Sequence, residues 1–398
     1  MRFIDFFAGI GGFRRGLELS GHECVGFCEF DKFATASYTS MHLLNEEQRK
    51  QLSEIPQRKR QKEILKEEYR NGEWYAKDIR SVNAKDVPRA ECWCFGAPCQ
   101  DFSVAGRRAG LDGDRSSLVR EIFRLLEEQE EQNRPEWLIY ENVKGMLSSN
   151  RGLDYLSILS EMDRLGYDCE WQNINSKWYV PQNRERIYTI GHLRRYGRSK
   201  IFPVAGTGGE NSIRQIASQY CATRKNPQIM RTYEIDGIAP CLNCMEGGNL
   251  EPHVAMPYLI GGIGEINFGK QFRQGNRVYS SDATAMCLNS QPVENTGGNS
   301  YLYSIRTKEK IKQGDGIYIE MPGGFLAYCV WYKKYQCYIA IRKLTPKECF
   351  RLQGWTDDYF EKAAFVNTDN QLYKQAGNGV TVNVVEAIGK KIKEYENN

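Results

Sequence analysis

The stretch RFIDFFAGIGGFRRGLELSG, residues 2–21, sets how the chain begins to fold. Residues 2–8 form an apolar run typical of a buried strand, and the glycines after it predict a tight turn. Residues 13–21 have helical spacing, with Phe13 and Leu17 four positions apart. A strand, a glycine turn and a helix in that order predict the first unit of an α/β fold.

The same alternation continues through the first half of the chain. We predict further strands at residues 24–30, 90–98, 135–143 and 185–193, and helices at residues 32–44, 116–132 and 152–167. Because strands and helices alternate, the strands should be mostly parallel, with right-handed crossovers. Residues 1–195 are therefore expected to form a doubly wound α/β domain of Rossmann-like type with a mostly parallel sheet.

Two segments break this pattern. Residues 44–77 contain 16 charged residues of both signs among 34, which predicts a solvated helical insertion. An arm that follows nucleic-acid phosphates is the alternative interpretation. Residues 196–340 are rich in glycine and asparagine and lack helical periodicity, so we expect a smaller, irregular β and loop domain. Residues 341–398 return to helical patterns and are expected to complete the first domain.

The irregular segment contains an internal repeat with an offset of 46 residues. QIMRTYEIDGIAPCLNC begins at Gln228 and QGNRVYSSDATAMCLNS begins at Gln274, so that Arg231 corresponds to Arg277. Two copies are too few for a solenoid, and we interpret them as a partial duplication.

Composition and charge narrow the class of protein. The sequence has no run of 18 apolar residues that would predict a membrane span, and its N-terminus lacks the features of a signal peptide, so we expect a cytoplasmic protein. The 13 cysteines should then be thiols, and their spacing does not predict a metal site. Residues 197–340 contain 15 Lys and Arg against 11 Asp and Glu, whereas residues 1–196 contain 30 against 31. This small excess favours contact with a polyanion only weakly.

The glycine turn predicts a site for an adenosine-type ligand. It lacks the dinucleotide fingerprint, because Arg14 stands where the last glycine of G-x-G-x-x-G would be. Glu29 ends the second strand 20 residues after Gly9, which is the usual place for an acid that binds ribose hydroxyls. Phe30 is a candidate to cover an adenine face, and Asp78 with Ile79 to reach a base edge. Core packing of Phe30 and Ile79, and a plain surface role for Glu29, remain alternatives.

Cys99 follows Pro98 at the carboxyl end of a strand, where open α/β sheets bind their ligands. From this residue alone, a nucleophile and an apolar filler are equally good interpretations. Glu141, at the end of LIYEN, favours the nucleophile, because an acid on an apolar strand is costly unless it is used or paired. We expect one of Arg184 and Arg186, in QNRER, to turn inward to an acid or a substrate carbonyl and the other to face outward.

Seven blocks of the sequence resemble DNA (cytosine-5)-methyltransferases of bacterial restriction–modification or orphan type. In order they are DFFAGIGGFRRGL, CEFDKFA, GAPCQDFSVAGRRAGLDGDRSSL, YENVKGML, PQNRERIYTIG, RKLTPKECFRLQGW and QAGNGVTVNVVEAIG. They cover residues 1–195 and 341–398 densely. In such proteins the intervening region, here 196–340, is the variable target-recognition domain.

The resemblance implies the catalytic roles. Cys99 would attack C6 of the target cytosine, Glu141 would bond N3 and the exocyclic amine, Arg186 would bond O2, and Arg184 would brace the site. C5 would then take a methyl group from S-adenosylmethionine, with S-adenosylhomocysteine as product. The resemblance implies these cofactor-binding residues: Phe7, Gly9, Gly11, Gly12, Glu29, Phe30, Asp78, Ile79, Pro98, Asn378 and Val380.

The resemblance also implies double-stranded DNA as the partner, with the target base flipped out of the helix. Residues 101–114 would close over that base, with Gln100 and Ser103 contacting the DNA. Arg231 and Arg277 are candidates to read the major groove, against an alternative in which both are ordinary surface residues. We expect a monomer, with any cognate restriction endonuclease acting separately. Two alternatives remain open: a tRNA cytosine-C5 methyltransferase and a catalytically inactive DNA-binding regulator.

Overall fold

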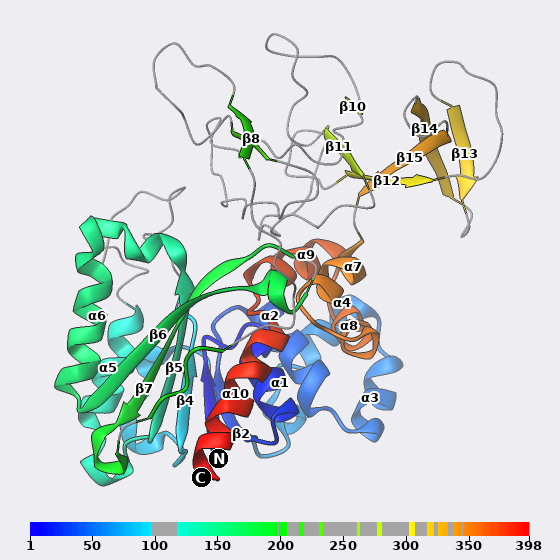
Figure 1. Cartoon of the computed structure of the whole chain (residues 1–398). Helices are drawn as coiled ribbons and strands as arrows, with labels where there is room; N and C mark the ends of the chain where they lie inside the picture. Colours follow the sequence, from blue (N-terminus) through cyan, green and yellow to red (C-terminus); the bar gives the residue numbers. More distant parts are fainter. Residues whose placement is uncertain are drawn as a thin grey trace.

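The computed structural model describes residues 1–97, 118–180, 182–197, 199–204 and 345–397, together with the backbone of eight strands between 215 and 343. Seven strands of the first part form one sheet, in the order β3-β2-β1-β4-β5-β7-β6 (Figure 1). The first five are parallel, whereas β7 pairs antiparallel with both β5 and β6. These strands are β1 (Arg2–Phe6), β2 (Glu23–Cys28), β3 (Trp74–Ala76), β4 (Cys92–Phe95), β5 (Trp137–Val143), β6 (Tyr167–Asn175) and β7 (Glu185–Leu193).

Alternate side chains of the central strands enter two separate cores. On one face, Trp93 and Phe95 of β4 pack with α5 (Leu118–Glu128) and α6 (Leu153–Arg164). On the other, Cys92 and Cys94 pack with α1 (Gly12–Leu19) and α10 (Val382–Glu396). Figure 1 shows these two pairs of helices on opposite sides of the sheet. The period of two along a strand thus fixes which helix each residue meets.

The C-terminal segment joins the N-terminal domain through α10. Gly16 of α1 lies so close to α10 that an added Cβ would be 2.6 Å from the Cβ of Val385. The shorter helices before α10 pack around Phe350 and Trp355 in a cluster that also contains Ile10. They are α7 (Pro346–Leu352), α8 (Asp357–Ala364) and α9 (Asp369–Asn378).

The charged segment 44–77 is only partly the solvated insertion that the sequence predicted. It forms α3 (Glu46–Ser53) and α4 (Gln57–Glu63), but Leu52, Ile64 and Tyr69 are buried in a cluster with Val366. Its end forms β3, which pairs with β2 as the edge strand of the sheet. The prediction missed this because charge dominates the composition, and three buried residues spread over 18 positions give no clear period.

The strands between 215 and 343 form two further sheets. β8 (Gln215–Ser218) pairs with β9 (Arg231–Tyr233), and a six-stranded sheet has the order β10-β11-β12-β15-β14-β13. In each copy of the internal repeat, a strand begins at the corresponding arginine: β9 at Arg231 and β11 at Arg277. The two strands nevertheless lie in different sheets. The remaining strands are β10 (Gly261–Gly262), β11 (Arg277–Ser280), β12 (Leu302–Arg306), β13 (Ile317–Met321), β14 (Phe325–Tyr332) and β15 (Cys337–Lys343).

The predicted fold class, a mostly parallel doubly wound α/β sheet, is confirmed. Strand β6 was not predicted, because its sequence YDCEWQNIN is largely polar. The carboxylate of Glu170 in this edge strand accepts hydrogen bonds from the backbone N–H groups of Ile201 and Phe202, at 2.7 and 2.9 Å. Ile201 and Val204 are buried against the first domain, so residues 199–204 still pack with it.

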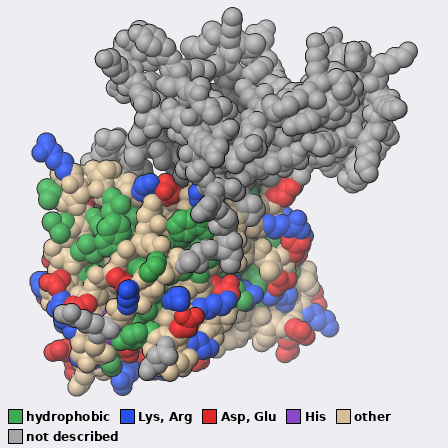
Figure 2. All heavy atoms as spheres, in the orientation of Figure 1, with side chains coloured by type: hydrophobic (Ala, Val, Ile, Leu, Met, Phe, Trp, Pro, Cys, Tyr) green, Lys and Arg blue, Asp and Glu red, His purple; other side chains and the backbone are tan. Residues whose placement is uncertain are grey.

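The described surface mixes charges of both signs. Figure 2 shows Lys and Arg side chains interspersed with Asp and Glu over the described part of this face. This agrees with the near balance of charge in residues 1–196. No helix in the part of the chain that the structure describes has the length and apolarity to cross a membrane.

Candidate active site

The turn between β1 and α1 adopts backbone conformations that few residues accept. Gly9 and Gly11 have φ of +56° and +84°, and Phe7 has φ of +57°. No atom lies within 4 Å of where a Cβ of Gly9 would be, so space is open beside this residue. Gly11 is the N-cap of α1, so the turn leads directly into the N-terminus of a helix. Such a turn lets a ligand approach the backbone closely.

Glu29, at the end of β2, fixes this turn from the neighbouring strand. Its Oε2 accepts a hydrogen bond from the Gly9 N–H at 2.8 Å, and its Oε1 accepts one from the Asp31 N–H at 2.7 Å. Burial raises the pKa of the Glu29 carboxyl, and these two N–H donors partly oppose that effect. Each oxygen retains a further lone pair for a hydroxyl. The ring of Phe30, next to Glu29, is 62% exposed.

Asp78 and Ile79 occupy different environments. The Asp78 carboxylate is held by the Arg80 guanidinium at 2.6 Å, and this bond lowers the pKa of Asp78. The Ile79 side chain is 3% exposed and packs in the core. Core packing, the alternative left open from the sequence, therefore describes the side chain of Ile79 but not the exposed ring of Phe30.

Glu141 lies at the carboxyl edge of the parallel strands. Its Oε1 is 3.2 Å from the Arg186 Nε, and its Oε2 is 3.4 Å from where a Cβ of Gly96 would be. Glu141 lies two residues before the end of β5, which pairs with β7 as far as Val143. The acid is thus paired, and it stands beside the backbone that leads from β4 toward Cys99.

The prediction that one of the two arginines faces outward is wrong. Arg184 is 4% exposed, and the Arg186 side chain is 12% exposed. Residues two apart in an extended chain project to the same side, so both turn inward. Arg184 donates to the carbonyl oxygens of Gly377 and Gly379, at 3.2 and 2.9 Å. It therefore ties the start of β7 to the connection between α9 and α10.

This connection also reaches the glycine turn. A Cβ added to Gly12 would lie 2.8 Å from the carbonyl oxygen of Val380, and one added to Gly96 would lie 4.0 Å from the Val380 side chain. Asn378 is exposed at the end of α9. The structure therefore brings residues 9–12, 96, 141 and 378–380 to one edge of the sheet.

Several predicted site residues fall outside the described part of the chain. They are Pro98, Cys99, Gln100 and Ser103, and the side chains of Arg231 and Arg277. Their roles stay predictions.

Comparison with known proteins shows which enzyme family the chain resembles over nearly its whole length. The family described as C-5 cytosine-specific DNA methylase matches residues 1–394. The chain belongs to this family. The methylase is 27% identical to the orphan methyltransferase M.Rho11sI of Bacillus phage rho11s, over 98% of this chain and 97% of that protein. It is also 27% identical to the type II methyltransferase M.HhaI of Haemophilus parahaemolyticus, over 98% and 94% of the two chains.

Solved structures agree on the fold of the methylase. S. pombe Dnmt2 methyltransferase matches with a TM-score of 0.59 at 16% identity, covering 100% of both chains. A putative DNA modification methyltransferase from an E. coli prophage matches with a TM-score of 0.53 at 14% identity, again covering 100% of both. The predicted family and the predicted DNA cytosine-5 methyltransferase activity are thereby confirmed, and this class of enzyme implies S-adenosylmethionine as methyl donor.

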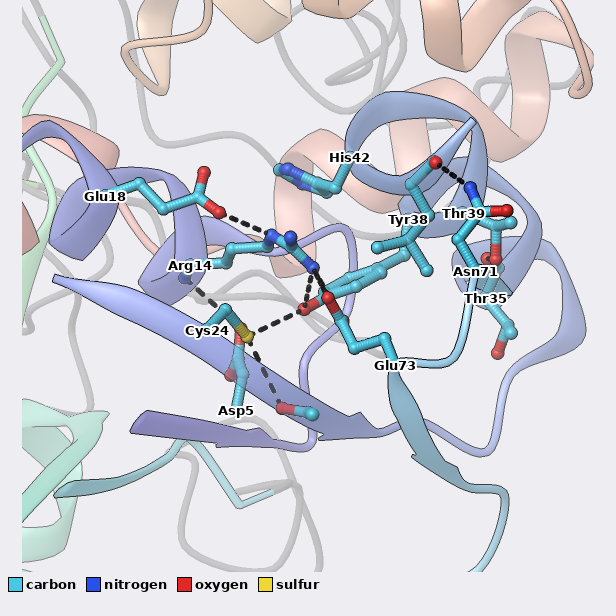
Figure 3. Close-up of polar contacts among 12 residues, drawn as sticks. Asp5, Arg14, Glu18, Cys24, Thr35, Tyr38, Thr39, His42, Asn71 and Glu73 are labelled. Atoms are coloured by element: carbon cyan, nitrogen blue, oxygen red, sulfur yellow. Dashed lines mark hydrogen bonds and ion pairs between the residues drawn. The ribbon is translucent and has the colours of Figure 1, made fainter. Parts of the chain in front are cut away.

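A buried polar network supports the glycine turn of the methylase, and the sequence did not reveal it (Figure 3). Arg14 of α1 bonds both carboxylate oxygens of Glu73, at 2.7 and 2.9 Å, and also the carboxylate of Glu18 and the hydroxyl of Tyr38. Little in the sequence indicated the Arg14–Glu73 pair, because Glu73 is 59 residues from Arg14 and lies in a segment with 16 charged residues. The network joins Glu73, just before β3, to the helix that follows the turn.

The methylase shows no sign of a metal centre in the ranges described. No group of three His, Cys, Asp or Glu side chains lies in a metal-binding arrangement there. The six cysteines whose side chains are described are free thiols. Cys92 and Cys94, in β4, are fully buried.

Proposed function

We propose that this methylase transfers the methyl group of S-adenosylmethionine to C5 of a cytosine in a specific sequence of double-stranded DNA. The observation that carries the proposal is the Glu141–Arg186 pair, with 3.2 Å between oxygen and nitrogen, at the carboxyl edge of the sheet beside Gly96. An acid and a guanidinium held together there present a donor and acceptor set that suits the N3, amine and O2 edge of cytosine.

The residues of the glycine turn fit the methyl donor. The open space beside Gly9, the adjoining N-terminus of α1 and the spare lone pairs of Glu29 suit a methionine group followed by a ribose. The exposed ring of Phe30 is proposed to cover an adenine, with Asp78 and Ile79 beyond it. Bound there, the donor supplies an electrophilic methyl group. Pro98, Asn378 and Val380 complete the proposed set.

The chemistry explains why these residue types are needed. The Cys99 thiolate forms a bond to C6, and the displaced electron pair moves to C5, which becomes nucleophilic. Glu141 bonds N3 and the exocyclic amine, and Arg186 bonds O2, so both draw charge from the ring. After the methyl group is on C5, the C5 proton leaves to solvent base. The bond between sulfur and C6 then breaks, which returns the thiolate and the aromatic base.

Arg184 acts on the position of these groups. Its bonds to the carbonyls of Gly377 and Gly379 fix the segment that carries Asn378 and Val380 against the start of β7. The same segment touches Gly12. Arg184 therefore aligns the donor side of the site with the Glu141–Arg186 pair.

Access to the cytosine requires that the base leave the helix, because C5 and C6 are shielded by stacking. We place residues 101–114 over the flipped base, with Gln100 and Ser103 as DNA contacts. Arg231 and Arg277 are proposed base readers, and the basic excess in residues 197–340 suits a phosphate backbone. We propose a cytoplasmic monomer, with any restriction endonuclease acting as a separate protein.

The test is expression in a host that lacks DNA methylation, followed by base-resolution mapping of 5-methylcytosine. We expect methylation of one cytosine within one short sequence, and none with Cys99→Ser. Purified protein is then assayed on duplex DNA and on tRNA side by side. Transfer to tRNA alone, or equal transfer by wild type and Cys99→Ser, would contradict the proposal.

A further inference from the structure

His42 contacts the glycine turn but takes no part in the proposed chemistry. It lies in the short helix η1 (Thr39–Leu43), beside the Arg14 network (Figure 3). Its Nε2 is 3.0 Å from the carbonyl oxygen of Ile10. A Cβ added to Gly11 would lie 2.5 Å from the same nitrogen. The imidazole therefore fills the space against two successive residues of the turn.

The hydrogen-bond partner determines the tautomer. A carbonyl oxygen only accepts, so Nε2 carries the proton and donates it to Ile10. Nδ1 is buried and has no hydrogen-bond partner among the described residues. Burial lowers the pKa of His42 well below its ordinary value, and the cationic Arg14, Arg15 and Lys362 around it act in the same direction. His42 is thus a neutral, single donor.

Aromatic side chains from both ends of the chain hold this ring in place. The centroid of the His42 ring lies 4.9 Å from that of Tyr38, in α2 (Lys32–Tyr38). On the C-terminal side it lies 6.0 Å from Trp355 and 5.4 Å from Tyr359. The orientation of the donor is therefore fixed by packing.

Two N–H groups of the turn are bonded to other partners. The Gly9 N–H donates to Glu29, and the Gly11 N–H donates to the Ala8 carbonyl, each at 2.8 Å. Ile10 is 1% exposed, so its carbonyl depends on His42 for a partner. Without the imidazole donor, the peptide unit that carries the Ile10 carbonyl could rotate. The neighbouring N–H groups of the turn would then change direction as well.

We infer that His42 is a positioning residue for the methyl donor, which holds the Gly9–Gly12 turn in the conformation that receives the methionine part of S-adenosylmethionine. The inference rests on the proposed function, because it assigns that ligand to the turn.

Three substitutions separate a donor role from mere space filling. His42→Gln retains an N–H near the Nε2 position, whereas His42→Asn does not reach it and His42→Leu has no donor. The matched control is His22→Leu, because the buried His22 also places its Nε2 3.0 Å from a carbonyl oxygen, that of Gly389 in α10. The full-length chain is studied. Calorimetry gives the dissociation constant for S-adenosylmethionine, turnover of plasmid DNA from a methylation-free host gives KM and kcat, and melting gives Tm.

We expect His42→Leu and His42→Asn to raise the Kd and the KM for S-adenosylmethionine roughly tenfold, because each loses one buried hydrogen bond. The kcat should change little. His42→Gln should remain close to wild type, and His22→Leu should lower Tm without moving Kd. Wild-type Kd in His42→Asn, or equally weak binding by the Gln and Asn variants, would overturn the inference. If His42→Leu does not fold, the Gln and Asn pair decides. Failure of the wild type itself to bind the donor would instead refute the proposed function.

Discussion

At the scale of single residues, the paired acid Glu141 is the group on which the chemistry is predicted to depend. Glu141→Gln keeps the size of the side chain but removes its acid, so kcat should fall by roughly 10²–10⁴-fold. Glu136→Gln is the matched control, because Glu136 precedes the other end of β5 and bonds His192. Steady-state rates and Tm are measured for both. A kcat for Glu141→Gln within threefold of the control would rule out a catalytic role for this acid.

Asp5 provides a second residue-scale prediction, about stability and pH. Its carboxyl is fully buried under α1, and burial raises its pKa well above the ordinary value. The native state then holds a proton that the unfolded state releases above about pH 4, so stability falls as pH rises toward the native pKa, by at most about 1.4 kcal/mol per unit. Asp5→Asn removes this penalty, and its stability relative to wild type should increase from pH 5 to pH 8.

Asp31 is the opposite case and serves as the comparison. The hydrogen bond from Lys374 at 2.7 Å and the capping bond from the Phe33 N–H outweigh burial, so the pKa of Asp31 is lowered. Its contribution to stability is present above its unfolded pKa of about 4 and is lost as pH falls through the native pKa. Asp31→Asn should therefore cost most near neutral pH and least near pH 3. Urea unfolding across pH measures both variants, and parallel pH profiles for wild type and Asp5→Asn would contradict the interpretation of Asp5.

At the scale of elements, a buried ion pair is one of the contacts that attach the charged insertion to the domain. Glu73, just before β3, bonds Arg14 with both side chains about nine-tenths buried. Glu73→Gln leaves the guanidinium without its buried partner charge and should destabilise the fold by about 3–5 kcal/mol. The control is Glu63→Gln, whose pair with Lys66 in the same insertion is exposed at the lysine, so this variant should remain close to wild type in stability. Equal losses in urea unfolding would show that the Arg14 pair does not anchor the insertion.

At the scale of the whole molecule, the first domain is completed only by residues far along the chain. Val384, Val385, Ile388 and Ile392 of α10 are fully buried in a core that includes Phe3 of β1. A chain that ends at residue 344 would lose α10 from this face of the sheet and expose apolar side chains there, so we expect it to be insoluble or to lack a cooperative melting transition. Removing only the last two residues should change nothing. A cooperative transition in the longer truncation, seen by circular dichroism, would refute this.

The fold class and one edge of the site were predictable because local patterns encode them. Strand and helix periods recur in order, and the turn at Gly9 and the acid at Glu29 stand at the ends of apolar strands. The expectation that one of Arg184 and Arg186 faces outward was wrong, because residues two apart in an extended chain project to the same side. Strand β6 was missed because its polar side chains serve backbone groups of residues 201–204. The roles of Cys99 and of the recognition residues remain predictions.

Local sequence was enough to establish the alternation of strands and helices, the mostly parallel sheet and the family, since these depend on periodicity and on ordered blocks of residues. Which polar groups are paired became known only from the packed molecule. Arg14 with Glu73, Glu141 with Arg186 and His42 with Ile10 join segments 32 to 59 positions apart. A buried polar group is stable only beside its partner, and the packing of sheet and helices alone determines which distant residue that partner is.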